Sequence, residues 1–150
     1  MGRSECGKTT LTQVLSGNPI SYQKTQYINH TSQFIDTPGE YAQTITLLKA
    51  LALYSYEADV VGLLLSCIED YSIFSPNLTA VCTRPVIGIV TKIDITEGDP
   101  ERAARWLALA GCNPIFYVSS YTGEGLWSIL DYLREPGDAL PVKQNWQPDN

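Results

Sequence analysis

The sequence predicts an α/β fold in three layers, with a mostly parallel β-sheet between two layers of helices. Apolar stretches of strand length, such as 59–67 and 86–90, alternate with segments of helical length. In addition, the chain opens on Gly2-x-x-x-x-Gly7-Lys8-Thr9, the P-loop pattern, which normally sits between a strand and a helix of such a sheet. We expect one domain over 1–135, because 150 residues are enough for a single core.

The P-loop pattern specifies which groups would hold a phosphate. Glycine at both ends allows close backbone approach and unusual φ and ψ, so that N–H groups of the loop can face the anion. Lys8 would bridge the outer phosphates, and the Thr9 hydroxyl would bind Mg²⁺. A glycine turn can match such a short pattern by chance, so its context matters. The residues expected to contact a nucleotide here are Gly2, Glu5, Cys6, Gly7, Lys8, Thr9 and Thr10.

The start of the chain lacks one expected element. A P-loop normally follows a buried strand, but no apolar stretch precedes Gly2. We therefore expect a sheet that lacks its first strand, whose place would be between the strand ending at Asp36 and the one starting near Asp59. Open strand edges leave backbone groups unpaired. Residues 1–150 alone should then be unstable or prone to aggregate, and an upstream extension should restore folding.

The other elements follow from apolar patterns and helix stops. The helix expected over 44–56 is apolar nearly all round, which predicts that Leu47, Ala50 and Tyr54 are left for a partner or a second copy of the chain. A disordered polar tail is expected over 136–150. Further helices are expected over 8–15, 100–110 and 124–133, and strands over 26–29, 33–36, 59–67, 86–90 and 115–118.

A second motif follows the strand over 33–36. Asp36 would hold Mg²⁺ through its water shell, and Gly39, in the sequence Asp36-Thr37-Pro38-Gly39, would offer its N–H to the terminal phosphate. Thr25 lies in a polar loop that could fold over the nucleotide and reach the metal. The metal ligands expected are thus Thr9, Thr25 and Asp36. The alternative is a strand followed by an ordinary Pro-Gly turn.

A third segment, Thr91-Lys92-Ile93-Asp94, stands at the end of a strand, where a base would be recognised. The Asp94 carboxylate could accept from N1–H and the amino group of guanine, and a mismatched base would leave it unpaired. Lys92 would pack its stem beside the base. Ser119 and Ser120 follow the next strand and complete the predicted contacts. The alternative is a solvated turn.

Composition excludes several classes of partner. A net charge of −6 argues against nucleic acid and anionic membranes, since both reward basic patches. The longest apolar stretch, 60–65, is too short to span a bilayer. The four cysteines form no C-x-x-C pair, which favours reduced thiols in the cytoplasm.

In this order the motifs resemble a Ras-like small GTPase domain and, more narrowly, the EutP/PduV family of ethanolamine and propanediol utilisation, with the PduV side nearer. The resemblance implies a protein that binds GTP or GDP with Mg²⁺, ATP being an alternative, and works with a bacterial microcompartment, whose shell or associated proteins would be its partners. It rests on Ser4-x-Cys6-Gly7-Lys8-Thr9, Tyr22-Gln23-Lys24-Thr25-Gln26, Ile35-Asp36-Thr37-Pro38-Gly39-Glu40-Tyr41, Phe74-Ser75-Pro76, Arg84-Pro85-Val86-Ile87-Gly88 and Thr91-Lys92-x-Asp94.

Three functions remain open. The first is a slow GTPase with Lys8, Thr25 and Glu40 as catalytic residues. Hydrolysis should be slow because Glu40 stands where many GTPases place a water-orienting Gln, and a carboxylate is a poor neighbour for an anionic phosphate. The second is a kinase that passes the γ-phosphoryl to a carboxylate such as acetate. Arg84 is the only obvious candidate to bind that acceptor, but its place before Pro85 indicates a structural role. The third is a non-catalytic adaptor.

Overall fold

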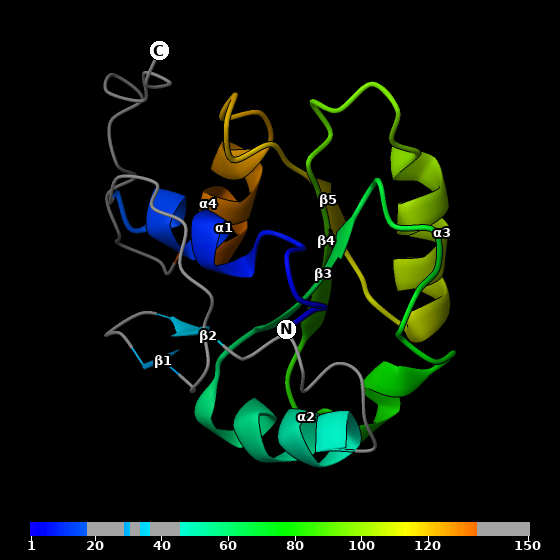
Figure 1. The fold of residues 1–150 in the computed structure, drawn as a ribbon. Helices are drawn as coiled ribbons and strands as arrows, with labels where there is room; N and C mark the ends of the chain where they lie inside the picture. Colours follow the sequence, from blue (N-terminus) through cyan, green and yellow to red (C-terminus); the bar gives the residue numbers. More distant parts are fainter. Residues whose placement is uncertain (18–28, 31–33, 37–45, 135–150) are drawn as a thin grey trace.

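The computed structural model describes residues 1–17, 29–30, 34–36 and 46–134. Within them the central sheet consists of three parallel strands in the order β3 (Val61–Ser66), β4 (Val86–Thr91) and β5 (Ile115–Tyr117), as Figure 1 shows. Two short strands, β1 (Asn29–His30) and β2 (Ile35–Asp36), pair antiparallel beside it. The predicted α/β class with a mostly parallel sheet is confirmed.

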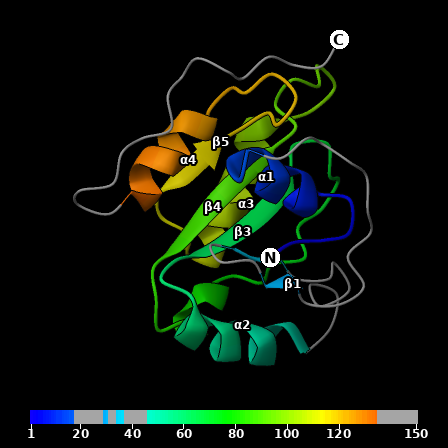
Figure 2. The same ribbon diagram turned by 90° about the vertical axis from the view of Figure 1, so that its left-hand side faces the viewer.

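Helices cover both faces of this sheet. Helices α1 (Lys8–Leu15) and α4 (Leu126–Leu133) lie on one face and stand in front of the strands in Figure 2. Helix α3 (Pro100–Ala110) covers the opposite face of the sheet. Helix α2 (Thr46–Glu57) contributes to the same core and lies at the bottom of the molecule in Figure 1. A short 3₁₀ helix, η2 (Leu78–Val81), completes the second layer. None of the helices in the described ranges is long and apolar enough to cross a membrane.

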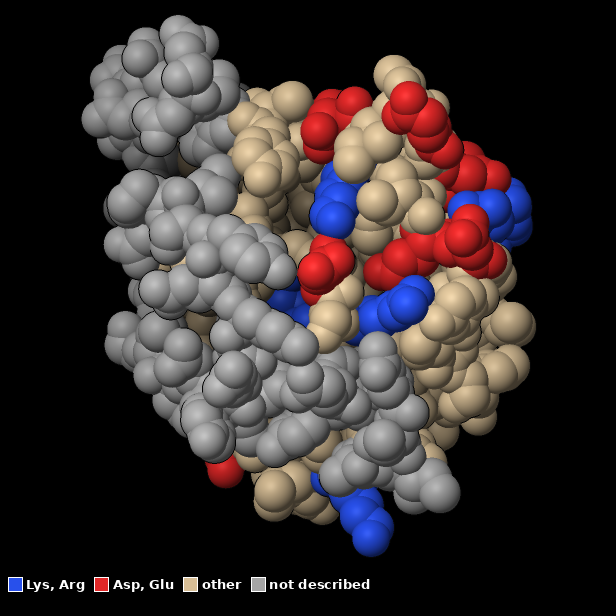
Figure 3. All heavy atoms as spheres, viewed as in Figure 1, with Lys and Arg blue, Asp and Glu red and all other residues tan. Residues whose placement is uncertain are grey.

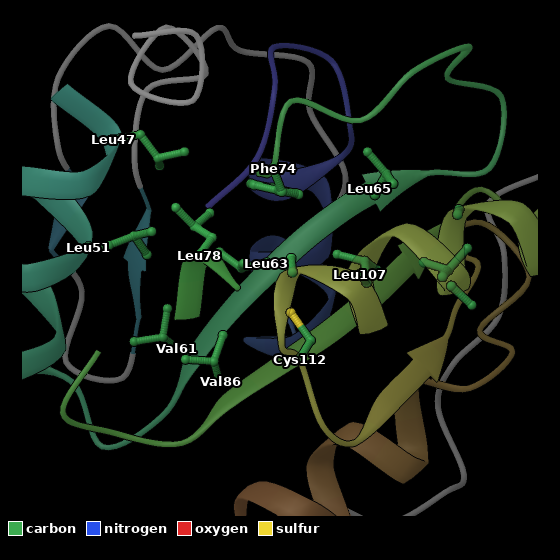
Figure 4. Close-up of a cluster of buried hydrophobic side chains, with 14 of the residues drawn as sticks. Leu47, Leu51, Val61, Leu63, Leu65, Phe74, Leu78, Val86, Leu107 and Cys112 are labelled. Atoms are coloured by element: carbon green, nitrogen blue, oxygen red, sulfur yellow. The ribbon is translucent and has the colours of Figure 1, made fainter. Parts of the chain in front are cut away.

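The alternation of side chains along the strands separates two cores. Odd-numbered residues of β3 join the cluster under α2 and α3, where Leu63 and Leu65 are fully buried (Figure 4). Leu64 points the other way and packs with Leu11 and Ile129 under α1 and α4. Since both faces are covered, strands β3 and β4 are apolar almost throughout, which is why their sequence patterns are continuous.

The first two residues extend the sheet on the side of β3. The Leu64 N–H donates to the Met1 carbonyl oxygen at 2.7 Å, and Gly2 forms a parallel bridge with Leu64. The terminal ammonium of Met1 donates to the Gly62 carbonyl oxygen. Met1 and Gly2 therefore lie beside β3, the strand expected to neighbour the segment before the P-loop. They lead into the loop from Gly2 to Thr9, here called the phosphate loop.

The expectation for α2 was wrong in its residues. Leu47 and Ala50 are buried and Tyr54 is half-buried, whereas the exposed apolar side chains of this helix are Leu48, Leu53 and Tyr56. The reason is helical phase. Positions 47, 50, 51 and 54 have the spacing i, i+3, i+4, i+7, which places them on one stripe that faces the core.

Other boundaries shift by a few residues. Helices α1 and α3 coincide with the predicted 8–15 and 100–110, while α4 starts at Leu126 instead of 124. Strand β1 begins at Asn29, where the predicted 26–29 ends. The predicted tail over 136–150 lies outside the described residues.

Candidate functional site

The phosphate loop has the backbone shape that its glycines allow. Gly7 has φ 95°, in the left-handed region that favours glycine, and directly precedes α1. Glu5 also has a positive φ, of 64°. The N–H groups of the first turn of α1 therefore open onto the loop, at the positive end of the helix dipole. This geometry fits the binding of an anion such as a nucleotide phosphate.

Gly2 is required for a different reason, the closeness of its neighbours. A Cβ at this position would lie 2.6 Å from both the Cys6 sulfur and the Leu64 carbonyl oxygen. The loop is thus folded tightly back over β3. Cys6 is buried at 1% exposure, and burial raises the pKa of its thiol, with the charge of Lys8 opposing. Its side chain acts as packing inside the loop.

Lys8 closes the loop from within. Its Nζ donates to the carbonyl oxygens of Gly2 at 2.9 Å and Arg3 at 2.8 Å. A phosphate in the loop would offer this ammonium stronger, charged acceptors than these two neutral carbonyls. Thr9 and Thr10 follow in the first turn of α1 and are half-buried. The loop residues named from the sequence thus lie together in one turn before α1 and in its first residues.

The Thr91–Asp94 segment, predicted to recognise a base, meets this loop at the end of β4. The buried Thr91 hydroxyl donates to the Cys6 carbonyl oxygen at 2.6 Å. Lys92 turns the chain with φ 62°, and the exposed Asp94 follows it. The Ile93 N–H donates to the Val118 carbonyl oxygen at 3.4 Å, so the segment lies beside the end of β5.

The residues after β5 stand next to this segment. Ser119 is fully buried, and its Oγ accepts from the Thr122 N–H at 3.1 Å. Its carbonyl oxygen accepts from the Gly123 N–H. Ser120 is half-buried. Phosphate loop, Thr91–Asp94 segment and Ser119–Ser120 therefore come together at the carboxyl ends of parallel strands, where ligands of such sheets bind.

The predicted metal site is only partly in view. Thr25, Gly39 and Glu40 lie outside the described residues, and for Asp36 the structure places the strand β2 but not the side chain. No group of three or more His, Cys, Asp or Glu among the described residues could hold a metal ion. Mg²⁺ takes most of its ligands from phosphate oxygens and water, so the Thr9 hydroxyl at the start of α1 fits its requirements. The set Thr9, Thr25 and Asp36 stays a prediction.

Arg84 does not belong to this site. It is exposed and precedes the first residue of β4, whereas the site lies at the other end of that strand, near Thr91. The distance along an extended strand of this length is roughly 20 Å. Arg84 is therefore wrongly placed to hold an acceptor carboxylate, whereas Arg3 lies in the phosphate loop together with Lys8.

Sequence reasoning also missed Glu69. This carboxylate lies three residues beyond β3, and its electrostatic neighbours are Arg3, Lys92 and Lys8. The sequence pattern that could have indicated it is an acidic residue shortly after a buried strand. Such a residue lies at the carboxyl ends of the parallel strands, where the P-loop also lies. It was overlooked because a Glu in a loop between two elements is ordinarily solvated.

Comparisons with known proteins agree on the relationship of the chain. A family model described as "Ethanolamine utilisation - propanediol utilisation" (PduV-EutP) matches residues 1–135. The chain is 40% identical over 136 residues to "Propanediol utilization protein PduV" of Citrobacter freundii, with 89% of each chain covered. It is 29% identical over 136 residues to "Probable acetate kinase EutP" of Salmonella typhimurium, covering 89% of this chain and 86% of the relative.

A solved structure has the same fold. The GDP-bound RocCORdC of Roco2 from Methanosarcina barkeri superposes with a TM-score of 0.58 at 18% sequence identity. The match covers 89% of this chain and 46% of that one, so the present chain corresponds to less than half of the larger protein. At this identity the likeness concerns the fold alone.

Proposed function

Since the chain belongs to the PduV-EutP family of ethanolamine and propanediol utilisation proteins, we propose that it binds GTP or GDP with Mg²⁺ and hydrolyses GTP slowly in the service of one of these pathways. The nucleotide phosphates would lie in the loop from Gly2 to Thr9, and the base against Lys92 and Asp94. Lys8 would bind the outer phosphates. Thr25 and Glu40 are proposed for the hydrolytic step.

The observation that carries this proposal is the bond from Thr91 Oγ1 to the Cys6 carbonyl oxygen, 2.6 Å long. It joins two segments that are 85 residues apart in the sequence. One segment has the groups that phosphates require, and the other has an exposed carboxylate suited to the donors of guanine. A nucleotide is the class of ligand that needs both kinds of group at one edge of a sheet.

The test is nucleotide binding by the full chain and by Lys8→Ala. Calorimetric titration with GTP, GDP and ATP should show binding of guanine nucleotides to the wild type and its loss in the variant, because the one lysine inside the loop is gone. The matched control is Lys49→Ala, which removes an exposed lysine of α2. Equal affinity of wild type and Lys8→Ala, or no binding to the wild type, would overturn the proposal.

Phosphoryl transfer to a carboxylate is the second candidate, favoured by the name of the EutP relatives and by the place of Arg3 in the loop. In that reaction a carboxylate oxygen attacks the γ-phosphorus and the bond to the β-phosphate oxygen breaks, giving an acyl phosphate and a nucleoside diphosphate. Measuring diphosphate release from ATP and from GTP, with and without acetate, separates the two functions. Release that requires acetate supports the kinase, and release independent of acetate supports the GTPase.

The family also leads us to propose a cytoplasmic location at a bacterial microcompartment, with a shell or associated protein as partner. A second copy of the chain is the alternative. The exposed side chains of Leu48, Leu53 and Tyr56 on α2 offer apolar surface for either. Sedimentation over a range of concentrations distinguishes them, because only self-association depends on the concentration of this chain alone.

A further inference from the structure

The loop that follows β3 contacts two parts of the candidate site, the phosphate loop and the Thr91–Asp94 segment. The Cys67 thiol donates to the carbonyl oxygen of Lys92, in the Thr91–Asp94 segment, at 3.1 Å. The guanidinium of Arg3, in the phosphate loop, lies over the ring of Tyr71 at 4.8 Å from its centroid. Arg102 of α3 donates from Nη2 to the Glu69 carbonyl oxygen at 2.9 Å. Glu69 is thus at the centre of a fixed loop.

The Glu69 carboxylate is held in place but incompletely paired. Its Oε1 accepts from the Ser66 N–H at 3.2 Å. Its Oε2 is covered and has no hydrogen-bond partner among the described residues. Burial raises the pKa of this carboxyl, while the nearby charges of Arg3, Lys92 and Lys8 act in the opposite direction. Figure 3 shows acidic and basic side chains interleaved on the face beside the undescribed residues.

The contacts of Cys67 with Lys92 and of Tyr71 with Arg3 place Glu69 between these two basic residues, and Lys8 donates to the Arg3 carbonyl oxygen. Lys92 and Lys8 are the residues that the proposed function assigns to base and phosphate. A negative charge at this position competes with the phosphates for Lys8 and repels them. The Ser66 N–H holds Oε1 of this carboxylate, and Arg102, which stacks on Trp106 at 5.2 Å from the ring centroid, holds the Glu69 backbone. The repulsion must grow with the number of negative charges on the ligand.

We propose that Glu69 is a specificity-determining residue that weakens nucleotide binding in proportion to phosphate charge, so that the site favours the diphosphate over the triphosphate. The proposal rests on the proposed nucleotide site. Glu69 acts through Lys8 and the field around it, without touching the nucleotide. Its removal should therefore strengthen binding, which is the opposite of what the loss of a supporting contact would do.

The experiment compares the full-length wild type with Glu69→Gln, which removes the charge and keeps an oxygen for the Ser66 N–H. Affinities for GTP, GDP and GMP are measured by calorimetry. We expect GTP affinity to rise about tenfold, equal to about 1.4 kcal/mol, with a smaller rise for GDP and almost none for GMP. High salt should reduce the differences in affinity gain between GTP, GDP and GMP, because it screens the repulsion between Glu69 and the phosphates. The matched control is Asp70→Asn, the same change of charge on the neighbouring exposed residue, which should leave all three affinities unchanged.

A second variant keeps the proposal testable if Glu69→Gln folds poorly. Glu69→Asp retains the charge and should keep the GTP to GDP ratio of the wild type. Weaker binding by Glu69→Gln, an equal gain for all three nucleotides, or an altered ratio in Glu69→Asp would overturn the proposal. These failures differ from failure of the proposed function, in which the wild type itself binds none of the nucleotides.

Discussion

The Thr91 hydroxyl and the Cys6 carbonyl oxygen are joined by a buried hydrogen bond of 2.6 Å, which fixes the end of β4 against the phosphate loop. Thr91 was expected from the sequence among the nucleotide contacts. Its hydroxyl instead points into the protein, toward the loop. This bond ties the Thr91–Asp94 segment, proposed for the base, to the phosphate loop. The position of one segment therefore affects the position of the other.

Thr91→Val should lower both stability and nucleotide affinity. The substitution keeps the shape of the side chain but leaves the buried Cys6 carbonyl without its donor, at a cost of about 1 to 3 kcal/mol. Chemical denaturation measures the stability and calorimetry the affinity. Thr91→Ser, which retains the hydroxyl, is the control and should stay near the wild type. Wild-type behaviour of Thr91→Val would show that the bond has no such role.

Asp94→Asn should weaken guanine nucleotides and relax the choice between purines. The amide nitrogen would face the donors of guanine, and hydrogen bonds to charged groups contribute about 1.5 to 3 kcal/mol each. Competition between GTP and ATP for the site measures the choice. Asp59→Asn, an exposed carboxylate just before the opposite end of β3, should leave it unchanged. If the wild type already binds ATP and GTP equally, the assignment of Asp94 to guanine fails.

Gly2→Ala should disrupt the fold of the phosphate loop far more than Gly17→Ala. At Gly2 the added methyl group would lie 2.6 Å from the Leu64 carbonyl oxygen, so β3 or the loop must move. At Gly17 there is no atom within 4 Å, and only the strain of φ 74° remains, about 1 to 2 kcal/mol. Thermal unfolding of both variants decides. A larger loss of Tm for Gly17→Ala would contradict the observed packing.

The effect of Glu69→Gln on stability should depend on pH. Burial raises the folded-state pKa of the Glu69 carboxyl above its unfolded value of about 4.3, so the folded protein binds the proton more tightly. The resulting stability is present below the unfolded pKa and is lost as the pH rises through the folded pKa. Without nucleotide, Glu69→Gln should therefore gain Tm relative to the wild type at pH 7 and gain less near pH 4. An equal difference at both pH values would contradict this.

Much of the fold could be predicted because its signals are local. Pro100 at the start and Gly111 after the end define α3 to the residue, and the apolar stretches around β3 and β4 have the continuity of strands covered on both faces. The phosphate loop was equally clear, since only glycine fits at Gly2 and Gly7. In each case the structure is decided by residues that are close together in the sequence.

Which side chains are buried, and which charged residues lie near one another, could be seen only in the tertiary structure. Helix α2 is apolar on nearly every side, so only its docking decides that Leu47 is buried and Leu53 is exposed. Arg84 was considered for an acceptor carboxylate, yet the sheet places it at the end of β4 that lies away from the phosphate loop. The sequence by itself predicted the groups that are proposed to hold a nucleotide. Only the tertiary structure decided that the charges of Arg3, Lys92 and Lys8 act on the Glu69 carboxylate. Burial and long-range charge depend on segments that are distant in the chain.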